Sequence, residues 1–413
     1  MRLNYKRLGD YIEPCNEKND GNVIKKLQGI SNRKYFQKAK TNTIGIDLSK
    51  YRVVRTGQFA FNRATTRNGD KISIALRHGK DCIVSPSYRI FKSKDENILN
   101  SEYLMMWFKR PDFDRYARFK SHGSAHEFFD WDEMQEVELP IPSIEKQRDI
   151  VAEYNTIVNR IKLNETLNQK LEETAQALYK NWFVDFEFPN AEGKPYKSSG
   201  GEMVYNEELD VEIPEGWEVP KLIEYTSLIT KGTTPKRMYT QFNRDRIVYI
   251  KSQSIGKNHF INQLKINYVD STTHNTELKR SIILEKDILF TITGAMVGDF
   301  AIADKEITPA NTNQNVAIIR FKNNNIHPYY LYFLLMSNWH QEFLIENTQD
   351  AIKPNLNLKM IGDMRIILPI ETVLELTYFM IKPIIEEKYY LHFQINKLVE
   401  LQNLLLSKMS KTV

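Results

Sequence analysis

The sequence predicts an α+β fold in which two similar β-rich modules are joined by two long antiparallel coiled-coil helices. The second half of the chain repeats the order of features in the first. Each half ends in a long heptad pattern, and a stretch rich in Gly, Pro and Ser separates the halves. The expected boundaries are 1–142 and 213–370 for the modules, 143–187 and 371–413 for the long helices, and 188–212 for a linker or loop.

The repeat consists of four features in one order. A buried strand at 59–61 recurs at 288–290, and a second strand at 87–92 recurs at 316–322. An aromatic helix at 101–108 recurs at 329–336, and a Leu-Pro-Ile motif at 139–141 recurs at 368–370. The strand and the motif each recur after 229 residues. One order at one spacing indicates a duplication, although two unrelated mixed α/β stretches could share such features by chance.

The first long helix is expected from about Ile144 to Phe183, with Ser143 as its N-cap. Its apolar positions alternate in steps of four and three: Ile150, Tyr154, Ile157, Ile161, Leu171, Ala175, Leu178 and Trp182. Asn164 and Asn168 fill the two gaps in this seam. They are either solvated where the seam loosens, or they set the register by pairing with a polar group.

The second long helix is expected after Pro369 and ends near Met409, and Pro383 should kink it or delay its start. Its seam consists of Ile384, Leu391, Ile395, Leu398, Leu405 and Met409, with Lys388 and Gln402 in the gaps. A helix with one apolar stripe is not stable alone. We therefore expect the two long helices to pack on each other in antiparallel orientation.

Composition favours a folded protein of the cytoplasm. The net charge of +5 indicates a slight preference for polyanionic partners. Cys15 and Cys82 are far apart in the sequence, so neither a disulfide framework nor a zinc site is expected. The first residues contain no apolar run typical of a signal peptide, and no stretch of 18 apolar residues predicts a membrane helix.

No motif for catalysis or for a cofactor stands out, so we expect a non-catalytic chain without cofactor or metal. The glycines at 293–299 have the spacing of neither a dinucleotide nor a phosphate loop. Residues 85–88 are a poor copy of the Asn/Asp-Pro-Pro-Tyr/Phe motif of amino-methyltransferases, and both stretches are interpreted as turns. His122, His126 and Glu127 are close in sequence, but no second metal-type pair accompanies them, so a surface loop is expected.

Several motifs carry a resemblance to a known family. The junction at 191–203 precedes Ile213-Pro-Glu-Gly-Trp217, which is followed by Lys231-Gly-Thr-Thr-Pro235 and by the segment 287–291. The segment 139–147 leads from the first module into its long helix. Together these motifs make nearly the whole chain similar to the DNA specificity subunit of type I restriction-modification systems.

The sequence departs from the pattern of this family in two places. The first module has Glu13-Pro-Cys-Asn16 where the second has Gly-Thr-Thr-Pro, and the second module ends without the Glu-Gln pair that follows the first. Recognition domains are expected to diverge because each reads different bases. The departures therefore put fine contacts in doubt but not the architecture.

The resemblance also implies function and partners. In that family each module is a target recognition domain that reads one half of a split DNA site. The long helices act as a ruler and as the docking surface for methyltransferase subunits. The expected partners are double-stranded DNA, two methyltransferase (modification) subunits and restriction/translocase subunits, with no membrane. The methylated base would be adenine.

Arg, Asn, Gln and Thr side chains read base edges in the major groove, whereas Lys and Arg contacts to phosphates position the reader. The candidate DNA-binding residues are Asn62, Arg63, Thr65, Thr66, Arg67 and Lys71 in the first module, and Lys231, Thr233, Thr234, Lys236, Arg237, Lys251, Gln253, Thr291, Thr293, Asn313 and Gln314 in the second. Each could instead belong to an ordinary polar turn. The loop at 311–315 is expected to be exposed.

Two other classes of protein remain open. A fragment of a fused restriction-methyltransferase enzyme, or a lone nuclease, would need a cofactor or metal motif, and a methyltransferase fragment would transfer methyl groups unaided. A coiled-coil assembly protein without DNA function would bind DNA weakly and without the steep salt dependence that phosphate contacts impose.

Overall fold

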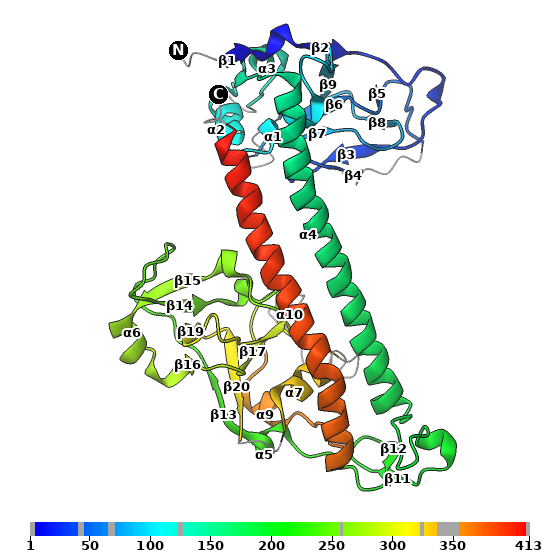
Figure 1. Ribbon diagram of the computed structural model, residues 1–413, viewed down its shortest axis with the longest axis vertical. Helices are drawn as coiled ribbons and strands as arrows, with labels where there is room; N and C mark the ends of the chain where they lie inside the picture. The colour runs from blue at the N-terminus through cyan, green and yellow to red at the C-terminus, as the bar shows by residue number, and fades with distance from the viewer. Residues whose placement is uncertain are drawn as a thin grey trace. The chain divides into compact units, whose positions relative to one another are not determined.

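The computed structural model describes residues 5–39, 45–64, 71–122, 127–256, 259–322, 326–336 and 355–409. The chain divides into two compact units. The first comprises Met1–Ile161 with Lys397–Val413, and the second comprises Lys162–Asn396. Each of the two long helices, α4 (Ile144–Tyr179) and α10 (Glu371–Lys408), therefore contributes one part to each unit (Figure 1).

The described part of the first unit contains short strands, the short helices α1, α2 and α3, the beginning of α4 and the end of α10. Its elements are β1 (Tyr5–Arg7), β2 (Ile12–Cys15), β3 (Gln28–Ile30), β4 (Phe36–Lys38), β5 (Arg52–Val54), β6 (Phe59–Asn62), β7 (Ile74–Leu76), β8 (Cys82–Val84), β9 (Tyr88–Ser93), α1 (Ser101–Phe108), α2 (Pro111–Phe119), α3 (Trp131–Gln135), β10 (Glu138–Pro140) and α4 (Ile144–Tyr179).

The main sheet of the first unit has the antiparallel order β2-β9-β6-β7. Its central strands are apolar on both faces because both faces are covered. Phe59 and Phe61 point into the core formed with α1 and α2, whereas Ala60 points to the opposite side, towards β5 and β8. Alternation along the strand thus places successive residues in two different cores.

In the second unit, α4 ends in a π-helical turn at Lys180–Val184. Its elements are β11 (Met203–Asn206), β12 (Val211–Pro214), α5 (Leu222–Tyr225), β13 (Thr226–Lys231), β14 (Arg246–Ile250), β15 (Asn267–Asp270), α6 (Ser271–Asn275), β16 (Ile282–Ile283), β17 (Ile288–Thr291), β18 (Phe300–Ile302), β19 (Ala310–Thr312), β20 (Val316–Phe321), α7 (Pro328–Leu335), α9 (Leu358–Asp363) and α10 (Glu371–Lys408).

The expected duplication is confirmed by strand topology. The main sheet of the second unit has the order β13-β20-β17-β18, which repeats β2-β9-β6-β7 element by element. The antiparallel pair β16–β19 corresponds to β5–β8, and α7 corresponds to α1. Phe290 on β17 again points to the helix side, and Leu289 points to the opposite core.

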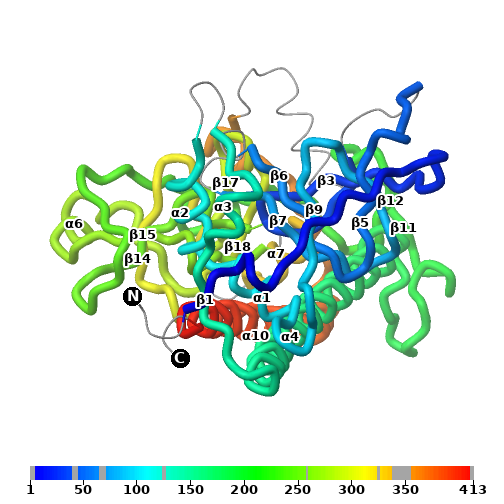
Figure 2. Tube along the Cα trace, turned by 90° about the horizontal axis from the view of Figure 1, so that it is seen from above, coloured from blue at the N-terminus to red at the C-terminus, as the bar shows by residue number. Residues whose placement is uncertain are grey.

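Within each unit, α4 and α10 run side by side in opposite directions (Figures 1 and 2). In the first unit, Gln402 Nε2 donates to the Tyr154 hydroxyl at 3.1 Å. In the second, Asn164 Nδ2 donates to Gln394 Oε1 at 2.9 Å. Asn164 is fully buried, so the structure favours its role in setting the register over the solvated alternative.

The expected delay at Pro383 does not occur, because α10 is helical from Glu371 through this proline. A proline removes the hydrogen bond to the carbonyl four residues earlier, here that of Phe379. Phe379 and Pro383 are both exposed, so water can satisfy that carbonyl. Among the described residues, no helix is both long and apolar enough to span a membrane.

Two further features differ from the sequence expectation. His392 and Asn396 on α10 are buried although the heptad seam does not include them. This second stripe arises because the second module also covers α10: the Phe260 ring stacks on His392 with centroids 4.9 Å apart. The segment 188–212 is more structured than a linker, since the Phe188 ring packs against that of Trp217 with centroids 5.2 Å apart, and β11 lies within the segment.

Candidate nucleic-acid interface

The loop after β6 is the first candidate surface, and only its ends are described. Asn62 is half-buried, and its Oδ1 accepts a hydrogen bond from Ala64 N at 3.1 Å, which forms a tight turn at the end of the strand. Lys71 is exposed on the other side of the loop. Three further candidates lie outside the described residues, namely Thr65, Thr66 and Arg67.

Arg63 does not extend freely into solvent. Its Nη1 donates to Asp130 Oδ2 at 3.0 Å, and its guanidinium lies 4.7 Å from the centroid of the Phe128 ring. Asp130 is the N-cap of α3 and forms a capping box with Glu133. The aromatic face and the carboxylate therefore hold the Arg63 guanidinium in one orientation.

Asp130 also binds a second arginine. Arg89 on β9 donates from Nε to Oδ1 at 2.8 Å and from Nη2 to Oδ2 at 3.2 Å. Burial alone would raise the pKa of Asp130, but hydrogen bonds from Arg89 and Arg63 outweigh it and hold that pKa below its usual value. The ionised Asp130 carboxylate thus binds the guanidinium groups of both Arg63 and Arg89.

A third arginine lies close to this group. Burial, together with repulsion from Arg89 and Arg63, lowers the pKa of Arg52 on β5. Arg52 Nη1 donates to Asn16 Oδ1 at 3.0 Å, in the loop after β2. Three guanidinium groups and one carboxylate give this part of the first unit an excess of positive charge, which suits an anionic ligand.

In the second unit the fold brings two candidate loops together. Thr233 N donates to Thr312 O at 3.0 Å, and the Thr234 hydroxyl is hydrogen-bonded to Gln314 Oε1. Gly232 permits this approach, because a Cβ at that position would lie 1.9 Å from Thr312 O. The loops at 231–237 and 311–315 therefore form one surface, although the sequence treats them as separate candidates.

Arg280 belongs to this surface and was missed by the sequence analysis. It donates from Nε and Nη2 to Thr233 Oγ1 at 3.1 and 2.9 Å. Arg52 and Asn16 make the comparable contact in the first unit. In both units an arginine at or just before the first strand of the smaller pair, β5 or β16, holds the loop that follows β2 or β13. A signal was present, because Arg280 precedes β16 as Arg52 begins β5.

The other candidates are distributed over the same unit. Lys231, Lys236 and Gln253 are exposed, and Lys251 is half-buried at the end of β14. Arg237 is exposed, and its guanidinium lies 5.0 Å from the centroid of the Tyr239 ring. Asn313 and Gln314 follow β19 directly, half-buried and exposed respectively. These positions allow contact with a ligand.

Thr291 requires a correction, because it is fully buried and cannot contact DNA in this conformation. It is the last residue of β17 and pairs with Val316 of β20, so the ladder continues one residue further than the sequence suggested. Asn311 and Thr312 were also expected to be exposed, but both are buried within β19. Thr293 is half-exposed, and its hydroxyl donates to Asn355 Oδ1 at 2.8 Å.

No group of three or more His, Cys, Asp or Glu side chains could hold a metal ion within the described part of the chain. His122 pairs through its backbone with Phe128, and Glu127 forms an ion pair with Arg118, while His126 lies outside the described residues.

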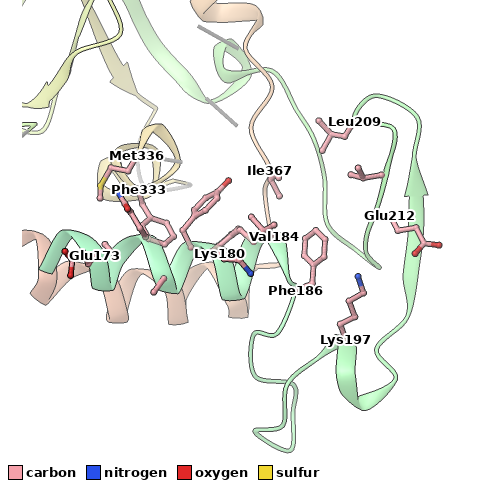
Figure 3. A pocket seen from close by; sticks show the side chains of 16 residues that line it. Glu173, Lys180, Val184, Phe186, Lys197, Leu209, Glu212, Phe333, Met336 and Ile367 are labelled. Atoms are coloured by element: carbon pink, nitrogen blue, oxygen red, sulfur yellow. The ribbon is translucent and has the colours of Figure 1, made fainter. Parts of the chain in front are cut away.

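A cavity of 990 Å³ in the second unit lies beside the C-terminal part of α4, the end of α7 and the β11–β12 segment (Figure 3). Phe183, Phe186 and Phe333 are among the residues that line it, and none of the candidate DNA-binding residues does.

Comparison with known proteins identifies the family. Residues 6–173 and 214–373 match the model of the type I restriction modification DNA specificity domain. The chain belongs to this family. Each match covers nearly all of one of the duplicated modules, and the first also covers most of α4.

Relatives of this specificity-domain chain are similar over most of its length. It is 29% identical to the type I restriction enzyme MjaIX specificity subunit of Methanocaldococcus jannaschii, over 75% of this chain and 68% of that protein. It is 22% identical to the HindI specificity subunit of Haemophilus influenzae, over 97% of each chain. The crystal structure of an S subunit from M. genitalium shares the fold, with a TM-score of 0.58, 12% identity and coverage of 99% and 98% of the two chains.

Proposed function

We propose that this chain is the sequence-reading subunit of a type I restriction-modification complex. Each module, 1–142 and 213–370, acts as a target recognition domain for one half of a bipartite, asymmetric DNA site. The two long helices dock methyltransferase and restriction subunits. The chain itself supplies no catalytic group, so methyl transfer, translocation and cleavage belong to its partners.

One observation supports this proposal above the others: a single sheet scaffold occurs twice and carries different polar side chains at its loops. In the first unit the loop after β2 is held by Arg52 through Asn16, and in the second the loop after β13 is held by Arg280 through Thr233. A repeated scaffold with unlike reading groups suits a target with two unlike halves.

The test is to map methylated adenines in a host genome with and without this gene. We expect one bipartite motif with two different half-sites, which disappears when the gene is deleted. The purified chain should bind that motif with an affinity that falls steeply between about 50 and 200 mM salt, because phosphate contacts release counterions. Methyl transfer by the chain alone, or affinity without salt dependence, would contradict the proposal.

A further inference from the structure

The duplication supplies an internal comparison for the arginines of the first unit. There, Phe129 N donates to Arg63 O at 2.8 Å. In the second unit, Leu356 N donates to Ile292 O at 2.9 Å. The two backbone hydrogen bonds join equivalent segments, so Arg63 occupies the position that Ile292 holds in the second unit.

The partners of Arg63 can be matched in the same way. By strand register, Arg89 opposite Phe61 corresponds to Ala317 opposite Phe290. Asp130, the N-cap of α3, corresponds to Asn357, the N-cap of α9.

In the second unit, Ile292 and Ala317 are buried in the core on the helix side of the sheet. The same fold therefore forms without charges at these positions. The charged group in the first unit is not required by the scaffold, and its stabilising effect should be small because all three side chains are partly solvated. The exposed fractions are 36% for Arg63, 34% for Asp130 and 27% for Arg89.

The two arginines use their donors differently. Arg89 uses Nε and Nη2 on both carboxylate oxygens of Asp130. Arg63 uses only Nη1, and no other described residue accepts a hydrogen bond from its guanidinium. With Phe128 against its face, Arg63 presents a planar, oriented group whose other donors meet no acceptor among the described residues. Such a group matches the O6 and N7 acceptors of guanine, whereas a phosphate contact needs charge but no fixed plane.

We propose that Asp130, supported by Arg89, is a positioning residue that aims Arg63 at a guanine in the half-site read by the first unit. The inference rests on the proposed function and adds to it the base that is read and the residue that orients the reader. The second unit, which has Ile292 and Ala317 at these positions, reads its half-site by other groups.

The test uses the full-length chain and selection of bound duplexes from a pool randomised over both half-sites. Asp130→Asn should keep the helix cap, as Asn357 does in the second unit, but lose the charge that orients Arg63. We expect the preference for guanine at one position of one half-site to fall about tenfold or more, with the other half-site unchanged.

Two further variants separate base reading from phosphate binding. Arg63→Ile installs the residue found in the second unit and should abolish the same preference. Arg63→Lys keeps the charge but not the planar group, so it should lose the preference while affinity for random DNA stays within about twofold. Glu136→Gln is the matched control, because it removes an exposed carboxylate that pairs with Arg7.

The outcomes distinguish this inference from the proposed function. If the parent chain selects no bipartite sequence, the proposed function itself fails. If the parent selects one but Asp130→Asn and Arg63→Lys leave the guanine preference intact, only the inference is overturned. A uniform loss of affinity over all sequences in the Arg63 variants would assign Arg63 to a phosphate and overturn it as well.

Discussion

Replacing Glu172 with glutamine removes one charge from a pair between the two long helices of the second unit. Lys388 on α10 is 3% exposed and pairs with Glu172 on α4, which is 23% exposed. Besides this carboxylate, the Lys388 ammonium faces the Phe260 ring, 5.8 Å from its centroid. The variant therefore leaves a buried ammonium with an amide and an aromatic ring as its neighbours.

The size of the effect follows from burial. Removing one partner of a fully buried ion pair costs about 3–5 kcal/mol. Glu172 retains some solvent contact and glutamine can still accept a hydrogen bond, so we expect about 2–3 kcal/mol at pH 7. Replacing both residues, Glu172→Leu with Lys388→Met, should fall within about 1 kcal/mol of the parent, since the desolvation penalty disappears together with the attraction.

The pH dependence has a defined sign. Burial lowers the pKa of Lys388 to about 8 from an ordinary value of 10.5. Between these values the unfolded chain binds more protons than the folded chain, so stability from this group rises with pH. The penalty of Glu172→Gln should therefore shrink as the pH is raised through 8, because the buried lysine can then become neutral.

Hydrogen exchange followed by mass spectrometry measures the effect locally. Peptides from the 380–396 part of α10 should exchange faster in Glu172→Gln, while peptides from β6 and β9 of the first unit serve as the internal reference. The reasoning is refuted if the single variant leaves α10 protection unchanged, or if the double variant is less protected than the single one.

Three further predictions concern the second unit. Gly232→Ala should weaken binding to one half-site by about tenfold, because its Cβ would collide with Thr312 O. The prediction is contradicted if the variant loses no more affinity for one half-site than for the other. Burial lowers the pKa of His259 to about 4, so stability should fall by about 3 kcal/mol in total as the pH drops from 6.5 to 4, and His259→Phe should lack this loss in urea titrations. Asn164→Leu combined with Gln394→Leu removes the hydrogen bond between buried Asn164 and half-buried Gln394, and it should raise the free energy of unfolding by about 1 kcal/mol; a lower free energy of unfolding in denaturant titrations would contradict this.

Much of the architecture could be predicted because it is local or repeated along the chain. The long helices begin and end within a few residues of the expected positions, since a heptad pattern and an N-cap are properties of one segment. The duplication was visible as four features at one spacing, and the sheet orders repeat accordingly. Lys388 and Asn164 were correctly placed in the gaps of the helix seams, and both are buried.

The candidate reading surface could be predicted only in part. Its loops were recognised by composition, but composition does not show that the loop at 231–237 meets the loop at 311–315, or that Arg280 holds Thr233. Asp130 is 67 residues from Arg63 in the chain. Nothing in the local pattern around either residue indicates their contact.

The sequence by itself determined the two-module plan, the two long helices and the family, because these depend on periodicity and on repeated order. Tertiary structure decided which polar residues are exposed and which side chains meet. Thr291 is buried because β17 pairs with β20 through its last residue, and Arg63 is oriented because β6, β9 and the start of α3 converge. The first outcome arises from strand register and the second from the meeting of a strand end with a helix N-cap far away in the chain, and neither leaves a trace in the local composition.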